Sequence, residues 1–98
     1  MRSVVWSSEA LNDFDSQINF IALRSLQNAT LVADRIEAAV AALQRGLTGR
    51  FGRVTGTYEK FVSKTSLIIA YKLGSDGGVN IVRIIHSAQD WQSEQWPK

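Results

Sequence analysis

Near its C-terminus the chain reads Val79-Asn-Ile-Val-Arg-Ile-Ile-His-Ser-Ala-Gln-Asp-Trp91, an almost wholly apolar segment with one arginine and the only histidine of the sequence. The run of β-branched residues from 79 to 85 predicts a β-strand. Strict alternation of side chains would divide this strand between two faces. One face would carry Val79, Ile81, Arg83 and Ile85, and the other Asn80, Val82, Ile84 and His86. Because both faces are mostly apolar, we expect both to be covered.

Length and composition bound the class of protein. Ninety-eight residues suit a single hydrophobic core, so we expect residues 1–98 to form one domain. The absence of cysteine excludes a disulfide framework, a thiolate zinc site and a cysteine nucleophile. With one histidine only, we expect no metal site and no other cofactor. No run of eighteen apolar residues and no signal-peptide pattern occurs, so the sequence predicts a cytoplasmic protein without membrane contact.

Positive charge is concentrated in the middle of the chain. Residues 45–83 carry seven basic and two acidic side chains, a net charge of +5. Residues 1–44 carry three basic and five acidic side chains (net −2), and residues 84–98 carry one basic and two acidic (net −1). Such a basic block either attracts an acidic partner or nucleic acid, or forms the solvated rim of a sheet. Because arginine and glycine occur together in it, we favour a role in recognition.

Hydrophobic periodicity predicts the order β-α-α-β-β-β. A short strand at Val4–Trp6 leads into a helix capped by Ser7, which turns its apolar residues inward and Asp13 outward. A second helix is capped by Asn28 and ends at Gly46. Three more strands are predicted at Tyr58–Val62, Leu67–Leu73 and Val79–Ile85, with a turn at residues 74–78. We expect an α+β domain in which an antiparallel helical hairpin packs on a small, twisted, mainly antiparallel sheet.

Short motifs within these elements resemble the RelE/ParE toxin superfamily, in particular its ParE branch. The segment Arg83-Ile84-Ile85-His86 resembles the last strand of that superfamily. Further motifs in the expected order are Gly49-Arg50, Gly52-Arg53, Gly56-Thr57-Tyr58-Glu59 and Ile68-Ile69-Ala70-Tyr71. The resemblance covers nearly the whole chain. It implies the RelE/ParE fold and the toxin of a type II toxin-antitoxin pair, a class linked to plasmid stabilization, which a cognate antitoxin neutralises.

The resemblance leaves three functions open. Members of the ParE branch inhibit DNA gyrase by binding to it, whereas RelE-type members are ribosome-dependent endoribonucleases that cut messenger RNA. A degenerate toxin, the third alternative, would only bind its antitoxin. We favour gyrase inhibition, with the antitoxin and DNA gyrase as partners. Sequence-specific contact with nucleic acid is expected only through the antitoxin.

An endoribonuclease of this metal-independent kind needs a general base, cations and a general acid within reach of one another. The candidates are Glu59 as base, Arg53 and Arg83 as charge stabilisers, and His86 as acid. Two positions depart from the superfamily's RNase pattern: Ser87 follows His86 where a tyrosine is common, and Tyr58 stands where arginine is usual. In the simpler interpretation Glu59 is a surface carboxylate and His86 a buried, hydrogen-bonded imidazole. We therefore expect binding rather than catalysis.

A binding function calls for cationic and aromatic anchors, which are enriched at interface hot spots. The target-binding candidates are Arg50, Arg53, Arg83, His86 and Trp91, with Trp96 as a further aromatic. Arg83 lies between Ile81 and Ile85, so we expect it to be partly buried against a carboxylate. The helical hairpin and the sheet edge should offer an apolar groove to an antitoxin helix.

Overall fold

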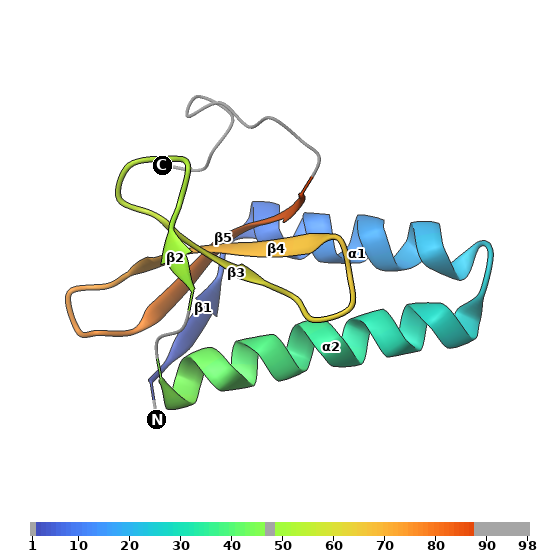
Figure 1. The fold of residues 1–98 in the computed structure, drawn as a ribbon, viewed down its shortest axis with the longest axis horizontal. Helices are drawn as coiled ribbons and strands as arrows, with labels where there is room; N and C mark the ends of the chain where they lie inside the picture. The colour runs from blue at the N-terminus through green and yellow to red at the C-terminus, as the bar shows by residue number, and fades with distance from the viewer. Residues whose placement is uncertain (1, 47–48, 88–98) are drawn as a thin grey trace.

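The computed structural model describes residues 2–46 and 49–87, which form two helices and a five-stranded sheet (Figure 1). In chain order the elements are β1 (Val4–Trp6), α1 (Ser8–Ala22), α2 (Leu26–Arg45), β2 (Arg50–Phe51), β3 (Tyr58–Phe61), β4 (Leu67–Leu73) and β5 (Val79–His86). The predicted α+β fold is confirmed, with β2 as an addition. Within the described part of the chain, no helix combines the length and the apolar character that crossing a membrane requires.

Serine side chains begin both helices. The Ser7 hydroxyl oxygen accepts a hydrogen bond from the Ala10 N–H at 3.0 Å, so the predicted cap of α1 is confirmed. The prediction for α2 was wrong, because its cap is Ser25. Asn28 lies in the first turn and donates its N–H to the Ser25 hydroxyl at 3.1 Å. Gly46 follows the last helical residue, as predicted.

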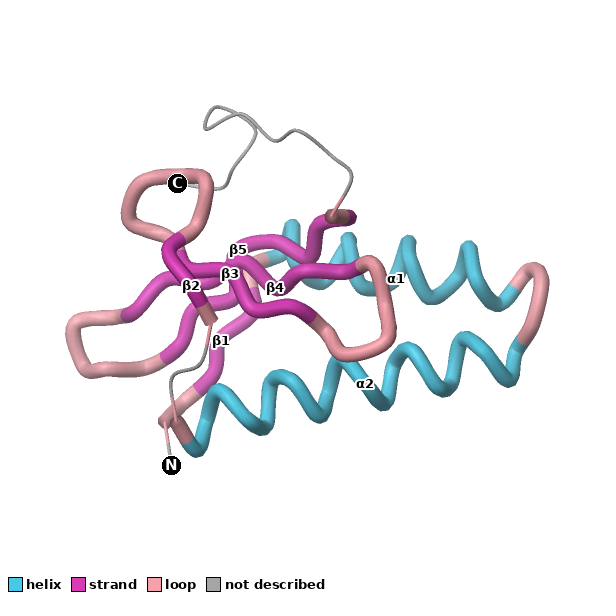
Figure 2. The backbone as a smooth tube through the Cα atoms, in the orientation of Figure 1, coloured by secondary structure: helices cyan, strands magenta, loops and turns pink. Residues whose placement is uncertain are grey.

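The strands lie in the order β1-β5-β4-β3-β2. β1 is parallel to β5, and the other neighbouring strands are antiparallel. Figure 2 shows α1 and α2 as an antiparallel hairpin that extends beyond the strands. The sheet is therefore mainly antiparallel, as expected. Its two edges are formed by β1 and by the short strand β2.

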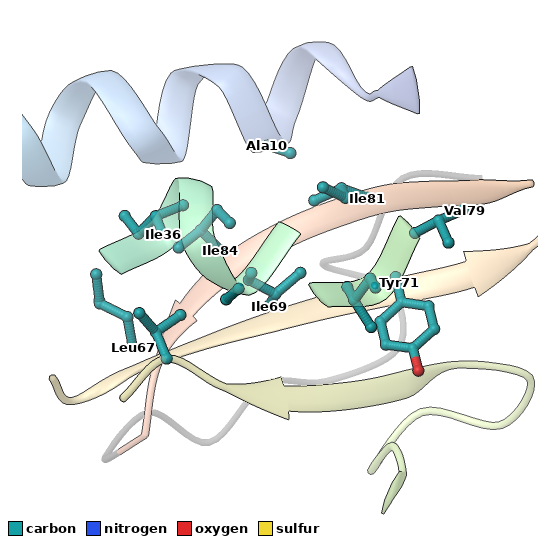
Figure 3. Packing of buried hydrophobic residues seen from close by; sticks show 11 residues of the cluster. Ala10, Ile36, Leu67, Ile69, Tyr71, Val79, Ile81 and Ile84 are labelled. Atoms are coloured by element: carbon teal, nitrogen blue, oxygen red, sulfur yellow. The ribbon is translucent and has the colours of Figure 1, made fainter. Parts of the chain in front are cut away.

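The main core lies between the helices and one face of the sheet. Figure 3 shows Ala10 of α1 and Ile36 of α2 over the strand residues of this core. The fully buried members include Ala10, Ile36, Leu43, Ile69, Val79 and Ile81. At roughly 1.5–3 kcal/mol for each buried aliphatic side chain, this layer is the main source of stability.

A β-bulge changes the expected faces of β5. Ala70 pairs with Arg83 but Tyr71 pairs with Ile81, so Val82 has no partner of its own in β4. As a result Ile81 and Ile84 both join the core under the helices. Val82 and Ile85 belong to a second buried cluster on the opposite face, against which Val54 packs. Both faces are buried, as expected, but the strict alternation of side chains was wrong after Ile81.

Candidate functional site

The glycine-rich loop folds tightly against β3 because glycines occupy the positions of closest approach. Gly49 has a φ of 124°, and a Cβ atom there would lie 2.6 Å from the Glu59 carbonyl oxygen. A side chain at Gly52 would collide with Thr57, whose carbonyl accepts a hydrogen bond from the Gly52 N–H at 2.8 Å. These contacts fix the path of the chain from β2 to β3.

Glu59 is the buried charge at the base of this loop, with 2% of its side chain exposed. Its Oε2 accepts hydrogen bonds from the backbone N–H and the Nε–H of Arg53, both at 2.9 Å. Its Oε1 accepts one from Arg53 Nη2 at 3.2 Å, and the Arg50 guanidinium lies 3.6 Å from the same atom. The interpretation of Glu59 as a surface carboxylate is therefore wrong. Sequence analysis missed its burial because Glu59 and Lys60 are adjacent in β3, a pattern that is typical of an exposed strand.

The pKa of Glu59 reflects two opposing effects. Burial raises the pKa of the carboxyl group, because it disfavours the charged form. The hydrogen bonds from Arg53, together with the charges of Arg53 and Arg50, outweigh burial, so the pKa lies below its ordinary value of 4.5. A carboxylate held in this way is a weak base, and both of its oxygens are already occupied as acceptors.

Arg83 forms the second buried ion pair, and its partner is Asp13 of α1. The Nε–H and Nη2–H groups donate to the two carboxylate oxygens at 2.7 and 3.0 Å. The same Asp13 carboxylate accepts the Ile84 N–H at 2.9 Å, beyond the point where β1 stops pairing with β5. The expected carboxylate partner of Arg83 is confirmed, but the prediction that Asp13 faces outward was wrong. An edge N–H group without a strand partner is the physical reason for its inward position.

The residues of the endoribonuclease set converge only in part, because Arg53 contacts Glu59 but Arg83 and His86 lie apart from them. Glu59 and Arg83 both pair with Ala70, so their backbones are two strand spacings apart, or about 10 Å. His86 pairs with Leu67, a member of the core under the helices, whereas Ala70 belongs to the cluster on the opposite face. His86 lines a cavity of about 280 Å³, together with Phe20, Ile21, Val32, Lys64 and Leu67 among others.

An aromatic column ends at the outer edge of the sheet. The rings of Phe51 and Tyr58 are stacked with centroids 5.6 Å apart, and those of Tyr58 and Tyr71 with centroids 5.5 Å apart. Phe51 is the outermost ring and is 84% exposed. Burial, with a smaller contribution from Tyr58, raises the pKa of the Tyr71 phenol. Sequence analysis missed Phe51, although an aromatic residue between Gly-Arg motifs is a usable signal.

Arg50 lies on the opposite face of β2 from this column, because it pairs with Glu59 whereas Phe51 pairs with Tyr58. Arg50, with 59% of its side chain exposed, places its guanidinium 4.7 Å from the ring centroid of Phe61, which is half exposed. Two of the predicted target-binding residues, Arg50 and Arg53, meet around Glu59. Two others, Arg83 and His86, lie elsewhere in the sheet. Trp91 and Trp96 are outside the described residues. Among the residues that the structure describes, no group of three or more metal-ligating side chains could hold a metal ion.

A groove of about 220 Å³ runs between α2 and β3. Small side chains of α2, Phe61 and charged residues line it. The lining residues are Arg35, Ala38, Ala39, Ala42, Lys60, Phe61 and Ser63. An apolar groove at the junction of the hairpin and the sheet was expected from the sequence.

The family model for the ParE toxin of the type II toxin-antitoxin system, parDE, matches residues 4–91. The chain belongs to the ParE toxin family. A solved structure described as the chromosomal ParDE TA system from P. aeruginosa is similar in fold to this ParE-family chain, with a TM-score of 0.75 and 22% sequence identity over 88% of this chain and 96% of the other. No curated protein shows significant sequence similarity to this chain. The resemblance to the ParE branch is thus confirmed.

Proposed function

We propose that this ParE-type toxin acts in the cytoplasm by binding and inhibiting DNA gyrase, and that a cognate antitoxin neutralises it. The observation that carries the proposal is the arrangement of the charged residues. Glu59 is buried and fully engaged by arginine, and His86 lies on the other face of the sheet. A base and an acid in these positions cannot act on the same ribose and phosphate, because proton transfer requires direct or single-water contact. Binding by a rigid, basic surface needs no such convergence.

Neutralisation is assigned to the groove between α2 and β3. Ala38 and Ala42 give its lining small apolar side chains, and Arg35 and Lys60 also line it. This combination suits an amphipathic antitoxin helix that places aliphatic residues against the alanines and carboxylates near the cations. The charges of Arg35 and Lys60 would then select acidic partners.

Induction in cells tests this function, with the plasmid topology and the messenger RNA examined in the same culture. Expression of the chain alone should arrest growth and relax a reporter plasmid, and co-expression with the antitoxin encoded beside it should restore both. Primer extension should show intact messages. New 5′ ends within translated codons, together with normal plasmid supercoiling, would contradict gyrase inhibition and show that the chain is an endoribonuclease.

A further inference from the structure

The outer edge of the sheet combines an exposed aromatic ring with an exposed cation. We name this surface the β2 edge, which consists of Arg50, Phe51 and Phe61. Phe51 leaves most of its ring in water, which is unfavourable for so large an apolar side chain. Tyr58 supports one side of the ring, so an incoming group meets it on the other side. By strand register the Arg50 side chain points to the opposite face of β2, so the edge presents a supported ring on one face and a cation on the other. Both residue types are enriched at interface hot spots.

The β2 edge is rigid before any partner arrives. Glu59 binds both the backbone and the guanidinium of Arg53, which fixes the loop that follows Phe51. The Arg50 guanidinium is held over Phe61, and Phe51 is stacked on Tyr58. A partner therefore loses little binding free energy to the ordering of these side chains. Glu59 acts here as a positioning residue.

The net charge of the segment that contains β2 and β3 indicates the chemistry of the partner. Between residues 49 and 64 the cations are Arg50, Arg53, Lys60 and Lys64, and the only acidic residue is Glu59. Glu59 is paired with Arg53 and offsets one of the four positive charges, so the stretch keeps a net charge of +3. The complementary surface is acidic, with an apolar recess for the Phe51 ring.

The turn between α1 and α2 provides a contrast. It too exposes large apolar side chains, among them Leu23 at 87%, and the Arg24 guanidinium lies 5.2 Å from the Phe20 ring centroid. Arg24 is, however, the only charged residue from position 16 to position 33. This turn lies at the opposite end of the molecule from β2 (Figure 1). It has the same residue types as the β2 edge without the surrounding positive charge.

We infer that the β2 edge is the surface with which the toxin recognises its target, and that the target offers an acidic protein surface with an apolar recess for Phe51. This inference rests on the proposed function, in which that target is DNA gyrase. Phe51 is the central anchor, and Arg50 supplies charge attraction. Arg53 supports the surface from within rather than contacting the partner.

The test compares two double variants of the full chain, Arg50→Ala with Phe51→Ala and, as the matched control, Arg24→Ala with Leu23→Ala. Each is assayed for growth arrest on induction, for inhibition of purified gyrase and for thermal melting. The β2-edge variant should need at least roughly tenfold more protein for half-maximal inhibition and should lose growth arrest. The control should stay within about twofold of wild type, a change expected for exposed residues outside an interface.

Folding and partner class are controlled separately. If the β2-edge variant melts at a lower temperature, Arg50→Gln, which changes one exposed charge, should still weaken inhibition and reduce its dependence on salt. Full activity of a normally melting β2-edge variant, or an equal loss in the Arg24 and Leu23 control, would overturn the inference. Binding of a labelled single-stranded oligonucleotide that depends on Phe51 would assign the edge to nucleic acid instead.

Failure of the proposed function can be told apart from failure of this inference. If the wild-type chain arrests growth without inhibiting gyrase, gyrase is not the target, and growth arrest alone then decides whether the β2 edge is required. If wild type inhibits gyrase and the β2-edge variant does so equally, the function stands and the surface assignment is wrong. If the wild-type chain neither arrests growth nor inhibits gyrase, both the proposed function and the surface assignment are wrong.

Discussion

Two buried ion pairs, Arg83 with Asp13 and Arg53 with Glu59, lie in different regions of the sheet. The first joins residues seventy positions apart and fastens α1 to β5, whereas the second joins residues six positions apart and holds one loop. Both Arg83 and Asp13 are nearly buried, at 14% and 16% side-chain exposure. In the second pair Glu59 is buried but Arg53 is 29% exposed. One pair therefore secures the fold, and the other shapes a surface.

The largest effect is expected from Arg83→Ala. Removing the guanidinium leaves the Asp13 carboxylate in a nearly buried position, where the Ile84 N–H still donates a hydrogen bond to it. Loss of one partner of a buried pair costs about 3–5 kcal/mol in the free energy of unfolding. Thermal and urea unfolding would measure this loss. Replacing both Asp13 and Arg83 by leucine is the control, since an apolar pair should be far less destabilising. A normal melting temperature for Arg83→Ala would contradict the claim that this ion pair secures the fold.

Glu59→Ala should destabilise the chain less than Arg83→Ala. The backbone N–H of Arg53 loses its acceptor, but the Arg53 guanidinium is partly exposed and can reach water. We expect a cost of about 1–3 kcal/mol in urea unfolding, with a larger relative loss of target binding because the β2 edge is no longer held in place. If target binding survives while stability falls, Glu59 supports the fold only and has no positioning role.

The pH dependence of stability isolates the charge of Glu59. Its folded-state pKa is lower than its unfolded value, so the carboxylate contributes stability that is fully present above pH 4.5 and is lost as the pH falls through the folded pKa. Wild type should therefore exceed Glu59→Gln in unfolding free energy at neutral pH, and the difference should shrink in acid below pH 4.5. A difference that does not change with pH would show that the ionised form has no stabilising role.

The smallest effect on stability is expected from Arg50→Gln. Arg50 is 3.6 Å from Glu59, but more than half of its side chain is in solvent. Exposed ion pairs contribute little, so the unfolding free energy should change by no more than about 0.5 kcal/mol. Chemical denaturation of wild type and variant side by side gives this value. A loss comparable to that of Glu59→Ala would mean that Arg50, not Arg53, holds the loop.

The sequence predicts those elements whose signal is local. The limits of β4 agree with the run of apolar residues, and Ser7 and Gly46 mark helix ends through their own side-chain and backbone properties. Asn28 was mistaken for a cap because serine and asparagine both accept backbone N–H groups, and only the register of the first turn distinguishes them. The two-residue strand β2 is too short to show periodicity, so sequence alone did not reveal it.

The candidate site was less accessible from sequence because it depends on contacts between strands and helices. The partner of Arg83 was expected to be a carboxylate, yet the choice of Asp13 depends on where β1 stops pairing with β5. The bulge at Val82 likewise arises from the pairing of β5 with β4. Arg50 and Arg53 were correctly grouped by their glycines, but the inward role of Arg53 becomes visible only with the burial of Glu59.

The most direct test of the central claim is inhibition of DNA supercoiling by purified gyrase when the purified wild-type chain is titrated into the reaction without ribosomes or RNA. We expect inhibition that rises with the amount of toxin added and is reversed by the antitoxin. Unimpaired supercoiling at a large molar excess of folded toxin, together with cleavage of translated messages in ribosome-containing extracts, would contradict it.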